Sequence, residues 1–154
     1  MEQIETRFGW VEYTPEEIVH FPEGLVGFEQ LRRFVVMPRE EDEPLVCLQS
    51  VDEGAFAFLL ADVGHFFPSY TVRVAQAERQ VLGVGADASV VVLAMITVHG
   101  DDSITVNLAA PVLYAPDTKC AFQKVLETTE FSTRTPLPVH KEGEEPETVS
   151  STGA

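Results

Sequence analysis

The stretch from Ser89 to Val98 is apolar at nearly every position and rich in valine. It is too short to span a bilayer, which takes about 20 helical residues. A valine-rich run without polar alternation is typical of a central strand that is buried on both faces. The chain is therefore expected to build a sheet that is covered on both sides.

Shorter β-prone segments surround this run and are separated by turn residues. The expected strands cover 4–8, 11–13, 33–37, 45–49, 55–60, 104–108, 112–114 and 120–126. The β/α alternation of a doubly wound sheet is absent. Short strands at close spacing predict an antiparallel barrel-like or sandwich domain.

Helical signals are few. Val74, Ala77 and Val81 repeat at helical spacing, and Gly83 is expected to end that helix. The run Thr14-Pro15-Glu16-Glu17 has the hydroxyl cap, the proline and the glutamate of a helix start. The sequence thus predicts a mainly β domain with one or two short helices.

The hydrophobic fraction of 45% in 154 residues is enough for the core of one domain. We expect this domain to span residues 1–137. From 138 to 154, prolines, glutamates and small polar residues cannot bury enough area to order themselves. That stretch is predicted to be a disordered acidic tail.

The segment Phe21-Pro22-Glu23-Gly24-Leu25-Val26-Gly27-Phe28 fits neither a regular helix nor a strand, because proline lacks an N–H and glycine loosens the backbone. It is also too apolar for an ordinary solvated loop. It is either buried as a structural plug, which the pattern favours, or exposed for a partner. Its two glycines are expected to have positive φ angles.

The chain has 25 acidic and 10 basic residues, a formal charge of −15. This charge disfavours direct binding to nucleic acid and to an anionic membrane surface, since both would repel it. Cationic partners are favoured, and long-range attraction would speed their encounter. The alternative is that acidity serves only solubility.

No catalytic or cofactor-binding motif is present: the sequence lacks GxSxG, HExxH, a Walker loop and a dinucleotide fingerprint. The four histidines are scattered, and none has a second histidine at metal-ligand spacing. Cys47 and Cys120 are too far apart for a CxxC pair. Cys47 is expected to be a buried strand thiol rather than a nucleophile paired with His65. The sequence predicts no enzyme, no cofactor and no metal.

Between Ile4 and Leu137 the chain resembles the FliW flagellar assembly factor family, through several motifs in the family's order and spacing. These are Phe21–Glu29, Leu48–Val51, Phe66–Tyr70, Val90–Val98, Thr105–Pro111 and Phe131–Leu137. Two positions depart from the family pattern: Ala115 stands near where an Asn is usual, and Phe131 where a Tyr is common.

The resemblance implies a β-rich, barrel-like, non-enzymatic cytoplasmic protein, and the absence of a signal peptide pattern also favours the cytoplasm. Family members bind flagellin before export, and they bind CsrA, a repressor of flagellin translation. The free protein is expected to be a monomer. The alternative is a generic acidic RNA-mimic inhibitor of a basic RNA-binding protein. The predicted partner-binding residues are Phe21, Pro22, Leu25, Phe28, Asn107 and Pro111.

Overall fold

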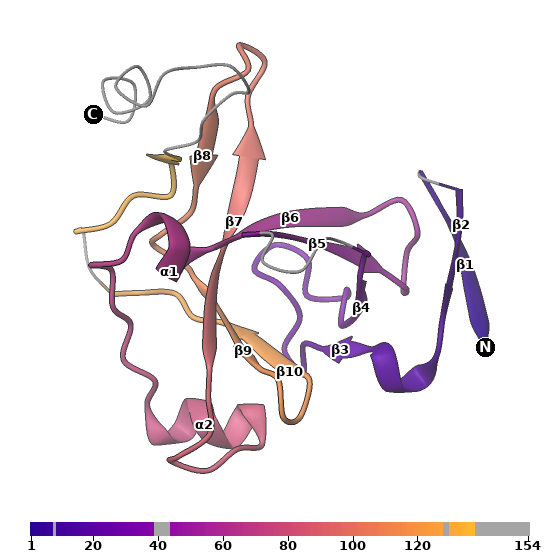
Figure 1. Ribbon diagram of the computed structural model, residues 1–154, viewed down its shortest axis with the longest axis horizontal. Coiled ribbons are helices and arrows are strands. Elements are labelled where there is room, and N and C mark those ends of the chain that lie inside the picture. Colours follow the sequence, from indigo (N-terminus) through magenta and orange to yellow (C-terminus); the bar gives the residue numbers. More distant parts are fainter. Residues whose placement is uncertain (8, 39–43, 128–129, 138–154) are drawn as a thin grey trace.

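The computed structural model describes residues 1–7, 9–38, 44–127 and 130–137, and most of its strands form one curved sheet (Figure 1). The strands are β1 (Glu2–Thr6), β2 (Gly9–Tyr13), β3 (Val19–His20), β4 (Arg33–Val36), β5 (Leu45–Ser50), β6 (Ala57–Asp62), β7 (Val91–Val98), β8 (Ile104–Val106), β9 (Val112–Ala115), β10 (Cys120–Gln123) and β11 (Thr135–Pro136). The helices are α1 (Val63–Phe66), α2 (Gln76–Leu82) and the 3-10 helix η1 (Pro15–Glu17).

In this part of the chain, seven strands close into a barrel in the order β7-β6-β5-β4-β3-β10-β9, and β9 pairs back onto β7. Most neighbours are antiparallel; β10 and β3 pair in parallel, with Cys120 opposite His20. The predicted antiparallel barrel-like fold is confirmed. The parallel pairing was not predicted, because it joins segments that are far apart in sequence.

Strand β7 lies between two cores. Leu93 packs with Leu60 and Val112 inside the barrel, while the next residue, Ala94, packs in a second core on the outer face. Two adjacent residues buried on opposite sides confirm the prediction of a strand covered on both faces. The prediction is wrong for the end of the strand, because Val98 is 60% exposed. There β7 leaves the barrel and pairs with β8, placing Val98 opposite Ile104.

The hairpin β1–β2 lies outside the barrel sheet and is seen at one side of Figure 1. Its inner face, through Ile4 and Val11, packs on a small core that includes Tyr13 and Val51. The β5–β6 turn meets it closely, because a Cβ added at Gly54 would collide with a backbone oxygen of β1.

The helices agree with the sequence in two of three cases. In η1 the Glu17 carboxylate accepts a hydrogen bond from the Thr14 amide at 2.8 Å. Helix α2 ends at Gly83, whose φ is +73°. Helix α1 was missed: it is only one turn long, and Asp62 caps it by accepting from the Gly64 amide at 3.1 Å. The predicted tail, 138–154, lies outside the described residues.

Candidate partner-binding site

The segment from Phe21 to Leu31, here called the plug, closes one end of the barrel. Phe21 and Leu31 are fully buried, and Leu25 is only 1% exposed. All three belong to the barrel core. The ring of Phe21 packs edge-on against Phe34, with centroids 5.1 Å apart. The burial that the pattern favoured for Phe21 and Leu25 is therefore found.

Both glycines of the plug have the expected positive φ, +70° at Gly24 and +85° at Gly27. Between them the backbone doubles back, so that the Phe28 amide donates to the Leu25 carbonyl at 2.8 Å. A side chain at Gly24 would run into the backbone of Glu29, whereas the space around Gly27 is open. The turn thus requires glycine at both positions, more strictly at Gly24.

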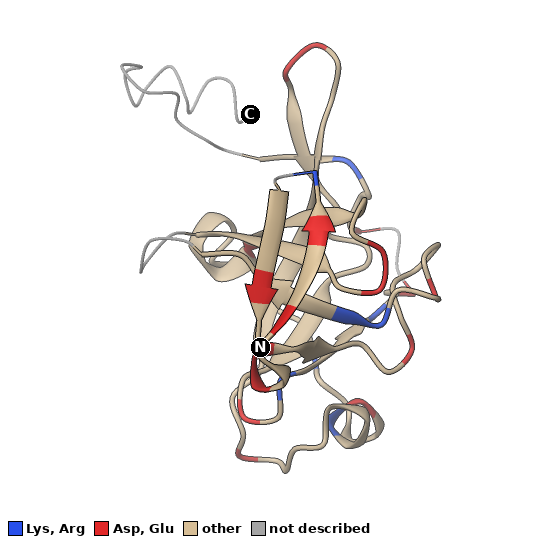
Figure 2. Cartoon of the chain, turned by 90° about the vertical axis from the view of Figure 1, so that its right-hand side faces the viewer, with Lys and Arg blue, Asp and Glu red and all other residues tan. Residues whose placement is uncertain are grey.

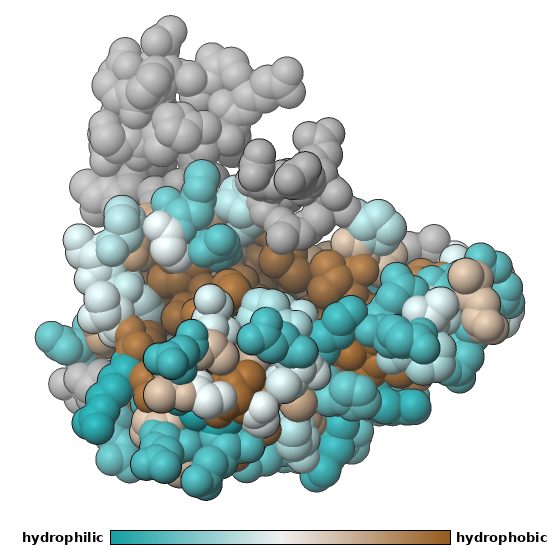
Figure 3. All heavy atoms as spheres, turned by 60° about the horizontal axis from the view of Figure 1, so that its bottom comes forward, coloured by the Kyte–Doolittle hydropathy of each residue, from teal (hydrophilic) through white to brown (hydrophobic). Residues whose placement is uncertain are grey.

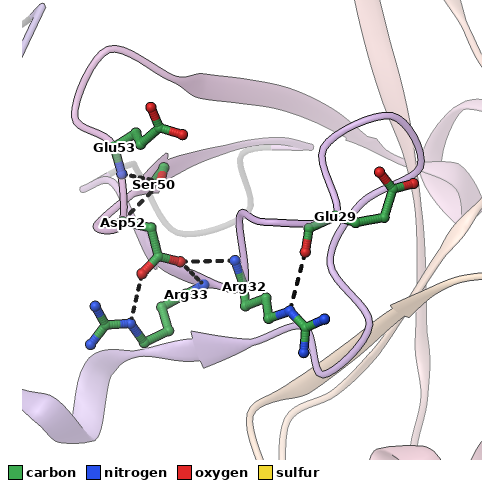
Figure 4. A network of polar contacts seen from close by, with 6 residues as sticks. All are labelled: Glu29, Arg32, Arg33, Ser50, Asp52 and Glu53. Atoms are coloured by element: carbon green, nitrogen blue, oxygen red, sulfur yellow. Dashed lines mark hydrogen bonds and ion pairs between the residues drawn. The ribbon is translucent and has the colours of Figure 1, made fainter.

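A carboxylate fixes the far end of the plug (Figure 4). Asp52, in the β5–β6 turn, accepts from the amides of Arg32 and Arg33 at 2.8 and 2.9 Å, and from Arg33 Nε at 2.9 Å. Arg32 Nη1 in turn donates to the carbonyl of Pro22 at 2.8 Å. Partial burial opposes ionisation of Asp52. The hydrogen bonds from Arg32 and Arg33 outweigh it and lower the pKa of the carboxyl.

The plug also has an exposed side, which is formed by different residues from those that face the core. Pro22 and Val26 are exposed, and Val26 at 56% is among the most exposed large apolar side chains of the described chain. Phe28 is half-buried against Phe56 and Phe58. A partner that met the plug from outside would contact Pro22 and Val26, and would reach Phe21 and Leu25 only if the barrel opened.

The second predicted group, Asn107 and Pro111, lies in the chain that leads from β8 into β9. The Asn107 side-chain oxygen accepts from the amides of Ala109 and Ala110, each at 3.1 Å. Pro111 is buried. In this structure Asn107 satisfies backbone groups and shapes the turn. That either residue contacts a partner stays a prediction.

The two groups meet at Gln123, which the sequence did not single out. Its Oε1 accepts from the Val26 amide at 2.9 Å, and its Nε2 donates to the Ala110 carbonyl at 3.1 Å. Beyond β10 the chain keeps pairing, since the Leu126 amide donates to the Ala109 carbonyl at 2.9 Å. This continues the strand predicted over 120–126, although β10 itself ends at Gln123. Val125, two residues beyond β10, is 60% exposed.

Gln123 holds the plug beside the end of β10, and the exposed side chains of these two segments are here called the plug surface. Three of them are apolar, Pro22, Val26 and Val125, and three are carboxylates, Glu23, Glu29 and Glu127. Apolar side chains beside charge are typical of a protein-binding surface. Acidic residues also occur elsewhere, including both strands of the β1–β2 hairpin (Figure 2).

The described residues contain no group of three or more His, Cys, Asp and Glu that would hold a metal ion. Cys47 is only half-buried, and burial raises the pKa of its thiol, an effect that the charge of Arg7 partly opposes. A thiol of raised pKa is a poor nucleophile. No helix in the described part of the chain has the length and apolar character needed to cross a membrane.

The fold and its surfaces thus define a small closed barrel with a plugged end and an acidic exterior. Comparison with known proteins agrees with this class. The model of the FliW protein family matches residues 2–137. A flagellar assembly factor FliW from Syntrophotalea carbinolica is 50% identical, with 88% of this chain and 96% of that protein covered. Flagellar assembly factor FliW 2 from Desulfotalea psychrophila is 42% identical, with 94% and 95% covered.

A solved structure agrees as well. The crystal structure of a flagellar assembly factor FliW superposes with a TM-score of 0.78 at 28% identity, covering 93% of this chain and 100% of that one. The chain belongs to the FliW family.

Proposed function

We propose that this protein is a cytoplasmic, non-enzymatic flagellar assembly factor that binds flagellin before export and binds the translational repressor CsrA. The match to FliW proteins over nearly the whole domain carries the proposal. When flagellin is scarce, the protein binds CsrA and keeps it from repressing flagellin mRNA. When flagellin accumulates, flagellin occupies the protein and CsrA is released to repress.

The charge supports the CsrA half of the proposal. A protein that holds RNA phosphates carries cationic surface, and a partner of charge −15 is attracted to that surface. Once docked, the same charge repels RNA. This protein can therefore inhibit CsrA without covering the RNA-binding site of CsrA.

The plug surface supports the flagellin half. We propose that its exposed apolar side chains receive the apolar face of a flagellin helix that has not yet been assembled into a filament. Neighbouring carboxylates at Glu23 and Glu127 would set the orientation of that helix. The residues that carry the contact are then Pro22, Val26 and Val125, with Gln123 holding the two segments together.

Val26→Asn tests the proposed contact, and Val98→Asn is a matched control. Both valines are highly exposed, at 56% and 60%, but Val98 lies on the β7–β8 hairpin outside the barrel. Neither change should alter stability by more than about 0.5 kcal/mol. We expect Val26→Asn to weaken flagellin binding about tenfold in calorimetric titration, in line with the loss of an interface contact worth more than about 1 kcal/mol. Equal affinity in both variants would remove the plug surface from the proposal.

Salt separates this function from that of a generic acidic RNA mimic, which the charge of −15 also fits. A mimic that relies on charge loses most of its affinity for CsrA as salt rises. The proposed contact with flagellin is apolar and should keep much of its affinity at high salt. Titration of flagellin at about 0.05 M and 0.5 M salt therefore tests the part of the proposal that a charge-based mimic does not share.

A further inference from the structure

The end of the barrel opposite the plug holds a cavity of about 160 Å³. Its walls are almost wholly apolar and include Val46, Leu48 and Val91, while Phe21 reaches it from the plug end. Small-molecule and cofactor pockets usually measure about 300–1,000 Å³. A cavity near 150 Å³ accepts an object of the size of a benzene ring. The space therefore suits one large side chain rather than a cofactor.

The cavity opens to the surface. Val36, one of the residues that line it, is 43% exposed. Figure 3 shows that apolar side chains also gather at the surface of one face of the molecule, among hydrophilic residues. Contact between an apolar hollow and water is unfavourable, so a partner group that covers the hollow lowers the free energy. This end of the barrel has no equivalent of the plug among the described residues.

Two polar side chains line the cavity, Asp62 and Tyr114. Asp62 Oδ1 accepts from the Gly64 amide at 3.1 Å, and within the described residues no hydrogen bond reaches its second oxygen, Oδ2. Burial raises the pKa of Tyr114, so its hydroxyl stays a neutral donor. A carboxylate oxygen beside an apolar hollow attracts a cation and repels an anion.

We propose that this mouth binds one large apolar side chain, Phe or Leu, of a partner protein in which a Lys or Arg follows and pairs with Asp62. The cavity volume sets the size of the anchor, and the carboxylate sets the charge of its neighbour. The charge of −15 on the whole chain favours the same cationic partners. The site lies at the opposite end from the plug surface and does not depend on which protein supplies the segment.

Two blocked peptides serve as probes, acetyl-Gly-Phe-Lys-Gly-amide and the same peptide with Glu in place of Lys. Methyl NMR of the full chain reports on Val46 and Val91, which line the cavity, and on Val98, which does not. We expect the Lys peptide to shift the two cavity valines and leave Val98 unchanged. It should bind about two- to fivefold more tightly than the Glu peptide, the range of a partly exposed ion pair.

Two variants sharpen the test. Ala121→Leu fills the cavity from inside, since Ala121 is buried in its wall, and should abolish the shifts. If this variant does not fold, Val112→Ile adds a single methylene and should weaken binding. Asp62→Asn keeps a residue that caps helices well and should make the two peptides bind equally. No shift at Val46 and Val91, shifts that persist in the filled variant, or equal binding of both peptides to the unaltered chain would each overturn the proposal.

Discussion

Replacing each glycine of the plug by alanine separates two costs that usually occur together. Gly24 and Gly27 both have positive φ, so alanine at either position pays about 1–2 kcal/mol for a left-handed backbone. A small part of this cost is offset, because alanine lowers the conformational entropy of the unfolded chain. Around Gly27 nothing lies within 4 Å of the new Cβ. Gly27→Ala should therefore destabilise the protein by about 1 kcal/mol.

Gly24→Ala carries a second cost. Its Cβ would lie 2.6 Å from the Cα and 2.7 Å from the carbonyl carbon of Glu29, so the backbone of the plug must move. Overpacking of this kind costs about 1–3 kcal/mol more. The total of about 3 kcal/mol is a large share of the 5–15 kcal/mol that stabilises a typical domain.

Urea denaturation followed by far-ultraviolet circular dichroism measures both variants. With a slope of about 1–3 kcal/mol per molar, the midpoint should fall by about 0.5 M for Gly27→Ala and by more than 1 M for Gly24→Ala. Similar shifts in the two variants, or a larger shift for Gly27→Ala, would refute the packing of the plug against Glu29.

Three further predictions concern single polar groups. Tyr70→Phe removes the hydroxyl that donates to the Leu108 carbonyl at 2.6 Å and should cost about 1–2 kcal/mol in urea denaturation. Burial raises the pKa of Tyr70 to about 12. The stability that the neutral hydroxyl contributes is therefore present below about pH 10 and is lost as pH rises through about 12. A series of melting temperatures against pH should show this alkaline loss in the parent and not in Tyr70→Phe. The pKa of Asp52 is lowered, so the stability that its carboxylate contributes is present above about pH 4 and is lost as pH falls further. Asp52→Asn should therefore have a lower urea midpoint than the parent at pH 7, and the difference should shrink as the pH is lowered below about 4. Asn107→Ala leaves two backbone amides without an acceptor and should destabilise the protein by about 1 kcal/mol. Asn107→Asp still offers an acceptor oxygen and should keep most of the stability. A urea midpoint that is unchanged in the alanine variant would contradict the turn geometry.

Local patterns predicted the barrel well. Strand β7 was recognisable because adjacent positions are both apolar, as a strand with two buried faces requires. The glycines of the plug were recognisable because only glycine adopts positive φ without strain. In both cases the physical cause lies within a few residues of the pattern.

Features that depend on distant residues were missed. Gln123 joins Val26 and Ala110, and no property of the isolated segment distinguishes it from a surface glutamine. The parallel pairing of β3 with β10 and the cavity at the mouth are products of barrel closure. For Phe21 and Leu25 the pattern favoured burial, which is found, and their role in partner binding stays a prediction.

Release of RNA from CsrA, measured with this protein and with flagellin, tests the proposed function most directly. A fluorescently labelled flagellin leader RNA is bound to CsrA, and its anisotropy is followed while this protein and then flagellin are added. We expect the protein to lower the anisotropy by releasing RNA, and an excess of flagellin to restore it. RNA that stays bound throughout, or release that flagellin does not reverse, would overturn the proposed function.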